Sequence, residues 1–164
     1  MTTLPVIDPE RTEFGFARTK CGCTNCREHC THTPGNLVPA DLERLFPGKL
    51  SSYSWVRRYL RASPGAIVAK AGRVFRIHTL VPARKEDGSC IFLEEDGCCG
   101  IHELAPYGCA FFDCHQSKAE ADQRSVAGLN DIAQAFFGDE LYAKLWRQLH
   151  EAGLTVPGPE TTRR

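Results

Sequence analysis

The chain has 164 residues, 42% of them hydrophobic, which is enough to bury a core without disulfide staples. Its 20 lysines and arginines balance its 20 aspartates and glutamates, so the net charge does not favour binding to nucleic acid or to an anionic membrane. No stretch approaches the ~18 apolar residues of a membrane span, and the start lacks the features of a secretory signal. We therefore expect a cytoplasmic protein with no membrane partner.

Proline and glycine divide the first part of the chain into short elements. Residues 1–20 predict an extended lead-in, and the cysteines that follow predict a knuckle-like turn. Pro39 suits the first position of a short helix. Ser51 and Ser52 are N-cap candidates for a second helix that runs to about residue 62, where Ser63-Pro64-Gly65 is expected to break it.

Short strands are predicted in the middle of the chain. Residues 66–69 and 73–81 are rich in apolar and β-branched side chains and are joined near Ala71-Gly72, which predicts a hairpin. The second strand partly alternates, so one of its faces is expected to be half exposed. Residues 90–93 predict a third short strand after a polar loop.

The last part of the chain predicts two helices. Ser117 and Glu120 have the spacing of a capping box, and apolar residues then recur at helical spacing up to Gly138. Asp139 is the expected cap of a final helix. The pattern as a whole predicts an α+β fold with small antiparallel strands and a C-terminal helical pair. We expect one domain over residues 21–153, with a core in 21–114, helices in 117–152 and a loose tail in 154–164.

The nine cysteines form two groups, four in residues 21–30 and five in residues 90–114. In a reducing compartment such clusters favour metal binding or redox chemistry over disulfides, and the odd count leaves one cysteine outside any all-disulfide scheme. Thiolates are soft ligands that prefer zinc, copper(I) and iron–sulfur clusters. Because a tetrahedral site commonly takes its ligands from two knuckles, we expect the two groups to share a metal.

Other interpretations of individual cysteines remain open. Cys23 and Cys26 have the spacing of a thioredoxin-like redox pair, but the βαβ unit that such a pair requires is not predicted. Cys21 is the first candidate for a structural thiol. The adjacent Cys98 and Cys99 can hardly both bind one ion in a relaxed geometry, so one is expected to ligate while the other packs inward or serves a second ion.

Three stretches of the chain resemble the CxxCxxCC (YkgJ-type) cysteine-cluster family of zinc- or iron-chelating domains. They are Cys23-x2-Cys26-x2-His29-Cys30, the Pro34-Gly35-Asn36-Leu37-x-Pro39-x-Asp41-Leu42 segment, and Cys90-x-Phe92-Leu93 with Cys99-x-Ile101-His102-Glu103-x2-Pro106-x2-Cys109. The resemblance covers roughly residues 21–114. It implies metal ligation by Cys23, Cys26, Cys30, Cys90, Cys99 and Cys109.

The chain departs from that family pattern at several positions. His29 stands where the family has a cysteine, and Ala105 and Ala110 stand where it has basic residues, so any anion contact made by those residues is lost here. The extra cysteines widen the candidate ligand set. That set is Cys23, Cys26, His29, Cys30, Cys90, Cys98, Cys99, Cys109 and Cys114.

The remaining polar residues near the cysteines have smaller roles in the prediction. Histidines beside the cysteines are further possible ligands, whereas His78 and His150 are expected to be structural or solvated. Glu103 and Asp113 are candidates to orient a ligand imidazole.

We expect a metal-binding protein that holds zinc through thiolates of both cysteine groups, in a structural or metal-handling role. The alternative is an iron or iron–sulfur protein with a redox or protein-modifying activity. No HExxH, GxSxG or P-loop motif is present, so no catalytic residue is predicted and enzymatic activity is left open. Nucleic acid is not an expected partner, because only the arginines at 57, 58 and 61 favour it.

Overall fold

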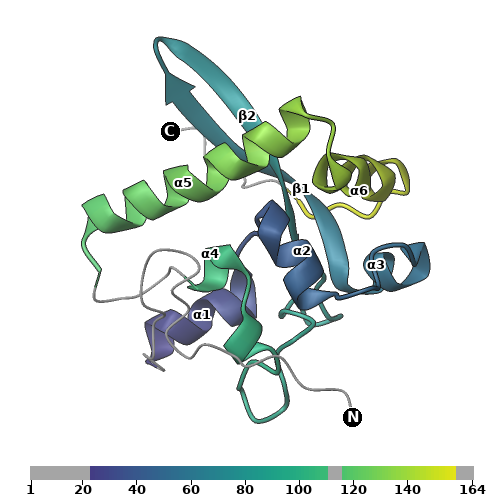
Figure 1. Ribbon diagram of the computed structural model, residues 1–164. Helices are drawn as coiled ribbons and strands as arrows, with labels where there is room; N and C mark the ends of the chain where they lie inside the picture. Colours follow the sequence, from purple (N-terminus) through teal and green to yellow (C-terminus); the bar gives the residue numbers. More distant parts are fainter. Residues whose placement is uncertain (1–22, 111–115, 158–164) are drawn as a thin grey trace.

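The computed structural model describes residues 23–110 and 116–157 (Figure 1). The elements in chain order are α1 (Thr24–His32), α2 (Pro39–Leu45), α3 (Tyr53–Tyr59), β1 (Leu60–Lys70), β2 (Arg73–Pro82), the 3-10 helix η2 (His102–Leu104), α4 (Tyr107–Ala110), α5 (Lys118–Phe137) and α6 (Leu141–Glu151). The predicted α+β fold is confirmed: the described residues form six α-helices and a two-stranded antiparallel sheet. None of the described helices has the length and apolar character needed to cross a membrane.

The predicted hairpin is confirmed, but its first strand is longer than expected. β1 begins at Leu60, so the segment Ser63-Pro64-Gly65 interrupts a strand and not a helix. The interruption is a bulge: the pairing of β1 with β2 shifts its register between Ser63 and Ala66. A bulge tolerates proline, which cannot donate to the ladder. Gly65 is required there, because its φ is +73° and a Cβ would lie 1.8 Å from the Ile77 carbonyl oxygen.

The cysteine segments differ most from the predicted elements. Residues 24–32 form helix α1 and not a turn, since no glycine or proline interrupts them. Residues 90–93 do not form a strand; Cys90 and Leu93 make isolated bridges to Arg84 and Cys99. The first bridge closes the loop that leads to Cys90, and the second closes a turn within the second cysteine segment, so this segment is held by local loops outside the sheet.

The C-terminal helical pair is confirmed. The Ser117 hydroxyl accepts from the Glu120 N–H at 3.2 Å and a Glu120 carboxylate oxygen accepts from the Ser117 N–H at 2.8 Å, which is the predicted capping box. α6 is capped at Glu140, one residue later than expected. The first residues of the predicted loose tail are bound to the sheet, because the Val156 N–H donates to the Ala62 carbonyl at 2.9 Å.

The hydrophobic core lies between the base of the hairpin and helices α2, α5 and α6. Tyr142 of α6 is buried there, and its hydroxyl donates to the Leu37 carbonyl and accepts from the Leu80 N–H, both at 2.7 Å. The Leu37 N–H in turn donates to the Leu80 carbonyl at 2.9 Å. These bonds fix the segment before α2 to the sheet. The cysteine-bearing helices α1 and α4 lie at the other end of the molecule from the hairpin tip (Figure 1).

Candidate metal site

A backbone hydrogen bond joins the two cysteine groups. The Cys90 N–H donates to the Cys30 carbonyl at 3.0 Å, which ties the last turn of α1 to the loop that begins the second group. Sixty positions separate these two residues in the sequence. The backbones of the two groups are therefore in direct contact, and the shared metal itself stays a prediction.

The loop from Cys90 to Gly100 folds back on itself. The Leu93 N–H donates to the Cys90 carbonyl at 3.0 Å, and the Gly100 N–H donates to the Phe92 carbonyl at 2.8 Å. Gly97 has a φ of +80°, a conformation that favours glycine, and it allows the turn between the two arms. This fold places Cys90 in a buried position and Cys99 in a half-buried one, whereas Cys98 faces solvent.

Two glycines let α4 approach the segment before α2. A Cβ on Gly35 would lie 2.2 Å from the Gly108 carbonyl carbon, and a Cβ on Gly108 would lie 2.4 Å from the Asn36 nitrogen. The close approach allows the Gly108 N–H to donate to the Asn36 carbonyl at 2.9 Å. It also allows the Gly35 N–H to donate to the Cys109 sulfur at 3.1 Å. These contacts set the position of Cys109.

The alanine substitution Gly108→Ala is expected to lower the free energy of unfolding by about 1–3 kcal/mol and to reduce metal content. The added methyl group collides with the backbone of Asn36, which cannot move without releasing α4. Urea unfolding and elemental analysis measure the two effects. Gly138→Ala is the control, because a Cβ there meets nothing closer than 3.4 Å. Equal stability of the two variants would contradict the assigned role of the Gly35–Gly108 contact.

Asp41 is a positioning residue for the site that sequence reasoning did not single out. Its side chain is fully buried, and one carboxylate oxygen accepts from the Val38 N–H at 2.9 Å and from the Tyr107 N–H at 2.8 Å. The other oxygen pairs with the guanidinium of Arg44. Asp41 thus caps the start of α2 and holds the start of α4, two residues before Cys109. The sequence does carry a signal for part of this role, because an aspartate and an arginine three residues apart on a helix can form an ion pair, as Asp41 and Arg44 do.

Arg44 completes this link to the second cysteine segment. Its guanidinium donates to the Leu104 carbonyl at 3.0 Å and to the Ala105 carbonyl at 3.3 Å. Burial raises the pKa of the Asp41 carboxyl, and Arg44 together with the two backbone N–H groups opposes that rise. The ion pair therefore joins α2, η2 and α4 around one buried carboxylate.

Four thiols, one from the first group and three from the second, lie within electrostatic range of each other. Desolvation raises the pKa of Cys90 to about 11, with contributions from Cys99 and Cys30. Desolvation also raises the pKa of Cys109 strongly; the Gly35 N–H opposes this rise, and the thiolates of Cys90, Cys30 and Cys99 add to it. Burial raises the pKa of Cys30 as well. Without a cation, this neighbourhood disfavours thiolates.

The other candidate ligands are placed differently. Cys23 is exposed at the start of α1, and Cys98 is exposed on the outside of its loop. Cys26 and His29 belong to α1, but their side chains, like Cys114 and Asp113, lie outside what the structure describes. Among the described side chains, no three cysteines, histidines, aspartates or glutamates form a group with metal-binding geometry. The four thiols thus share a neighbourhood without forming a closed coordination shell.

His78, His150 and two arginines of α3 make local contacts with aromatic rings. His78 and His150 pack against Trp146, with ring centroids 4.1 Å and 4.8 Å away, as expected of structural residues. Arg57 and Arg58 lie over the rings of Tyr53 and Tyr59, at 5.9 Å and 5.3 Å. These arginines are used locally, on the surface of α3.

The family comparison bears directly on this arrangement. The model of the CxxCxxCC family, described as "Putative zinc- or iron-chelating domain", matches residues 22–127. The chain belongs to the CxxCxxCC family. The matched CxxCxxCC region contains eight of the nine cysteines and extends past the earlier resemblance into α5. Comparisons with curated proteins and with solved structures found no match.

Membership of the CxxCxxCC family supports metal binding by this chain. The region that matches runs from α1 into α5, and it includes the contact between Gly35 and Gly108 and the buried Asp41. The features that position Cys109 therefore belong to the CxxCxxCC domain. Helix α6, which carries Tyr142, lies outside it.

Proposed function

We propose that this chain binds a metal ion through the thiolates of both cysteine groups, with Cys30, Cys90, Cys99 and Cys109 as the principal ligands. The observation that carries the proposal is the 3.0 Å hydrogen bond from the Cys90 N–H to the Cys30 carbonyl, which joins two segments far apart in the sequence. The thiols of Cys30 and Cys99 accordingly contribute to the raised pKa of Cys90 and Cys109. Cys23, Cys26, His29, Cys98 and Cys114 complete the candidate set. We propose zinc as the metal and iron as the alternative.

The donor set fits a soft or borderline metal ion. Four thiolates are a complete ligand set for a structural zinc ion. A divalent cation would offset the desolvation and mutual repulsion that raise the pKa of Cys90 and Cys109, because it favours the charged form of each sulfur. The Gly35 N–H already donates to the Cys109 sulfur, a contact that also favours a thiolate.

The part of the chain that the structure describes favours a binding or structural role over a catalytic one. Asp41 and Arg44, the ion pair at the start of the helix that carries Cys109, are engaged with backbone groups of α2, η2 and α4. Reduced thiols are needed for this role, so we propose a reducing, cytoplasmic location. The locally engaged arginines of α3 add no support for nucleic-acid binding.

An iron–sulfur or iron-dependent redox protein is the second candidate. Four cysteines also suit an iron–sulfur cluster, and the family description includes iron. The candidate set exceeds four residues, which leaves room for a second ion or for a cluster. The two candidates differ in colour, in oxygen sensitivity and in sulfide content.

The deciding experiment is elemental analysis with an absorption spectrum on protein purified without oxygen. The expected result is colourless protein that contains one or two zinc ions per chain. Brown protein that contains iron and sulfide would show that the chain holds an iron–sulfur cluster and not zinc, and it would support the redox alternative. Protein with no bound metal, after preparation without chelators, would contradict both candidates.

A further inference from the structure

The distal half of the hairpin exposes apolar side chains. Val74 is 72% exposed, Ile67 is 59% exposed and Phe75 is 47% exposed. Figure 1 shows the tip of the hairpin extending past α5. A two-stranded ribbon that projects in this way has exposed edges, which are the usual sites where a further strand adds.

The outer edge of β2 offers backbone groups in the orientation that strand addition needs. At Leu80, the carbonyl accepts from Leu37 and the N–H donates to Tyr142, so both point away from β1. The Ile77 carbonyl lies on the opposite side, next to Gly65 of β1. Because direction alternates along a strand, the N–H and C=O groups of Val74, Arg76 and His78 point outward as well. Among the described residues, no strand pairs with this stretch.

The chain itself already uses one end of this edge. Leu37 forms an isolated antiparallel bridge with Leu80, as the first step of a third strand would. The stretch from Val74 to His78 continues that edge toward the hairpin tip. Its length matches a short extended segment of about five residues.

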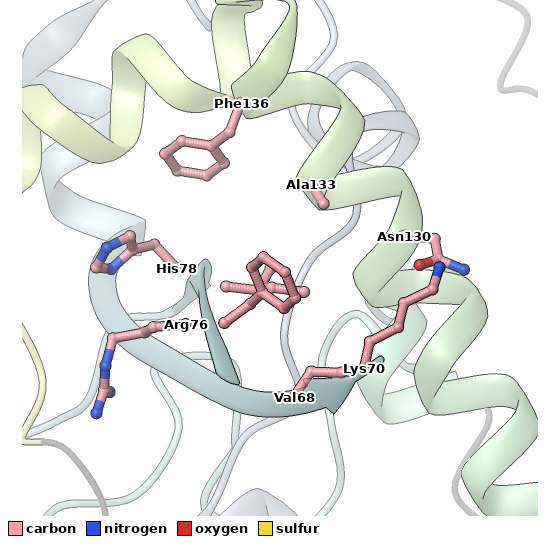
Figure 2. A pocket seen from close by; sticks show the side chains of 9 residues that line it. Val68, Lys70, Arg76, His78, Asn130, Ala133 and Phe136 are labelled. Carbon is pink, nitrogen blue, oxygen red and sulfur yellow. The ribbon is translucent and has the colours of Figure 1, made fainter. Parts of the chain in front are cut away.

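A groove lies between this face of the hairpin and α5. It has a volume of about 380 Å³, and its apolar lining consists of Val68, Phe75, Ile77, Ala133 and Phe136. Figure 2 shows the Lys70 side chain reaching toward Asn130 at one side, while Arg76 projects on the other side. Side chains that alternate along an added strand would enter this groove on the face shared with Phe75 and Ile77.

The charge of the hairpin indicates which kind of segment binds at the outer edge of β2. Residues 60–82 contain Arg61, Lys70, Arg73 and Arg76 and no acidic residue. Pairing of β2 with β2 of a second copy would bring Arg73 and Arg76 of the two copies close together, which is unfavourable for like charges in opposed strands. An acidic segment complements them.

We propose that the outer edge of β2, from Val74 to His78, binds an extended acidic peptide segment of a partner protein. The segment adds as a third strand, its backbone pairs with the outward groups of β2, and its alternate apolar side chains fill the groove against α5. Its acidic side chains alternate with the apolar ones and therefore lie on the other face of the ribbon, beside Arg76 (Figure 2). This surface is at the other end of the molecule from the cysteines, so the proposal does not depend on which metal is bound.

Fluorescence anisotropy with end-blocked heptapeptides on the full-length, metal-loaded protein tests the proposal. The probe alternates glutamate and valine, and the comparison peptide alternates lysine and valine. The glutamate peptide is expected to bind at least tenfold more tightly, and its affinity is expected to fall as salt is raised. Equal affinity for the two peptides, or no binding of the glutamate peptide at millimolar concentration, would overturn the proposal.

A matched pair of variants tests the backbone contact. Val74→Pro removes an N–H that points away from β1, so the hairpin ladder stays intact while the edge loses a donor. Val74→Ala removes the same exposed side chain but keeps the N–H. We expect Val74→Pro to weaken binding of the glutamate peptide about tenfold relative to Val74→Ala. Equal affinities would show that the peptide does not bind as a strand.

Arg76→Glu tests the charge, and sedimentation tests the second-copy alternative. The variant is expected to lose at least tenfold in affinity for the glutamate peptide, because Arg76 is exposed within the edge, on the face of β2 opposite Phe75 and Ile77. An unchanged affinity would overturn the assignment of an acidic partner. Concentration-dependent dimerisation that Val74→Pro abolishes would assign the edge to a second copy, against the proposal.

Discussion

Replacement of Asp41 by alanine is expected to lower the free energy of unfolding by about 3–5 kcal/mol, the range for breaking a buried ion pair. The carboxylate is fully buried, and its loss leaves the Val38 and Tyr107 N–H groups without their acceptor and Arg44 without its counter-charge. Urea unfolding monitored by circular dichroism measures the effect. Metal content should fall as well, because Tyr107 begins the helix that carries Cys109.

Asp122→Ala is the matched control for Asp41→Ala. Asp122 is also a helical aspartate with a basic partner, but its side chain is 61% exposed and pairs with Lys118 on the surface of α5. An exposed pair of this kind contributes about 0.5 kcal/mol or less. If the two variants lost similar amounts of stability, the buried carboxylate would not be the link between α2 and α4.

The pH dependence of Arg44→Ala gives a second check on the same residue. Burial raises the Asp41 pKa above its ordinary value of 3.8, and Arg44 opposes that rise, so removing the guanidinium raises the pKa further. A carboxyl group with a raised pKa in the folded state is destabilising when ionised. The stability defect of Arg44→Ala should therefore be smallest below pH 3.8 and should grow as pH rises through the folded-state pKa. A defect that stays constant with pH would contradict this coupling.

Local chemistry predicted the elements at the C-terminal end of the chain. The Ser117 and Glu120 pair gives a helix start whatever surrounds it, and Gly138 ends the same helix. Ala71 and Gly72 likewise define the hairpin turn, since both adopt positive φ. Signals of this kind act over a few residues, so they can be read without knowledge of the tertiary fold.

Elements that depend on distant partners were predicted poorly. Ser63-Pro64-Gly65 resembles a helix breaker, yet Gly65 is needed because β1 passes close to Ile77. Residues 90–93 have the composition of a strand, but their backbone groups bond to Cys30 and Ala83 and not to the sheet. In both cases a contact distant in sequence decides the conformation, and composition does not report it.

In the candidate site, too, local sequence patterns could be interpreted, whereas contacts between residues distant in the sequence could not. Cysteine spacing predicted that the two groups share a metal; the Cys30 to Cys90 hydrogen bond joins their backbones, and the shared metal stays a prediction. The role of Asp41 could not be inferred, because its importance comes from the Tyr107 N–H, which lies 66 residues away. The adjacent Cys98 and Cys99 could also not be distinguished from the sequence; they differ in the structure because Cys98 is exposed and Cys99 is half-buried and contributes to the raised pKa of Cys109.

Replacement of Cys109 by serine is expected to remove most of the bound metal and the stability that the metal confers. Structural zinc contributes on the order of 10 kcal/mol in zinc-dependent peptides, and the effect here should be smaller because the core of α2, α5 and α6 is independent of the cysteines. Serine keeps an acceptor for the Gly35 N–H but is a poor ligand for a soft metal. Elemental analysis and thermal unfolding, each with and without a chelator, measure the effect.

Cys98→Ser is the control that separates ligation from the general cost of replacing a cysteine. Cys98 lies in the same segment but is exposed, so this variant should keep its metal and its stability. A chelator should lower the melting temperature of the unmodified chain and of Cys98→Ser, and it should leave Cys109→Ser nearly unchanged because that variant has no metal to lose. If the chelator destabilised Cys109→Ser as much as the other two proteins, Cys109 would be a packing residue. The metal would then be held by the remaining cysteines without it.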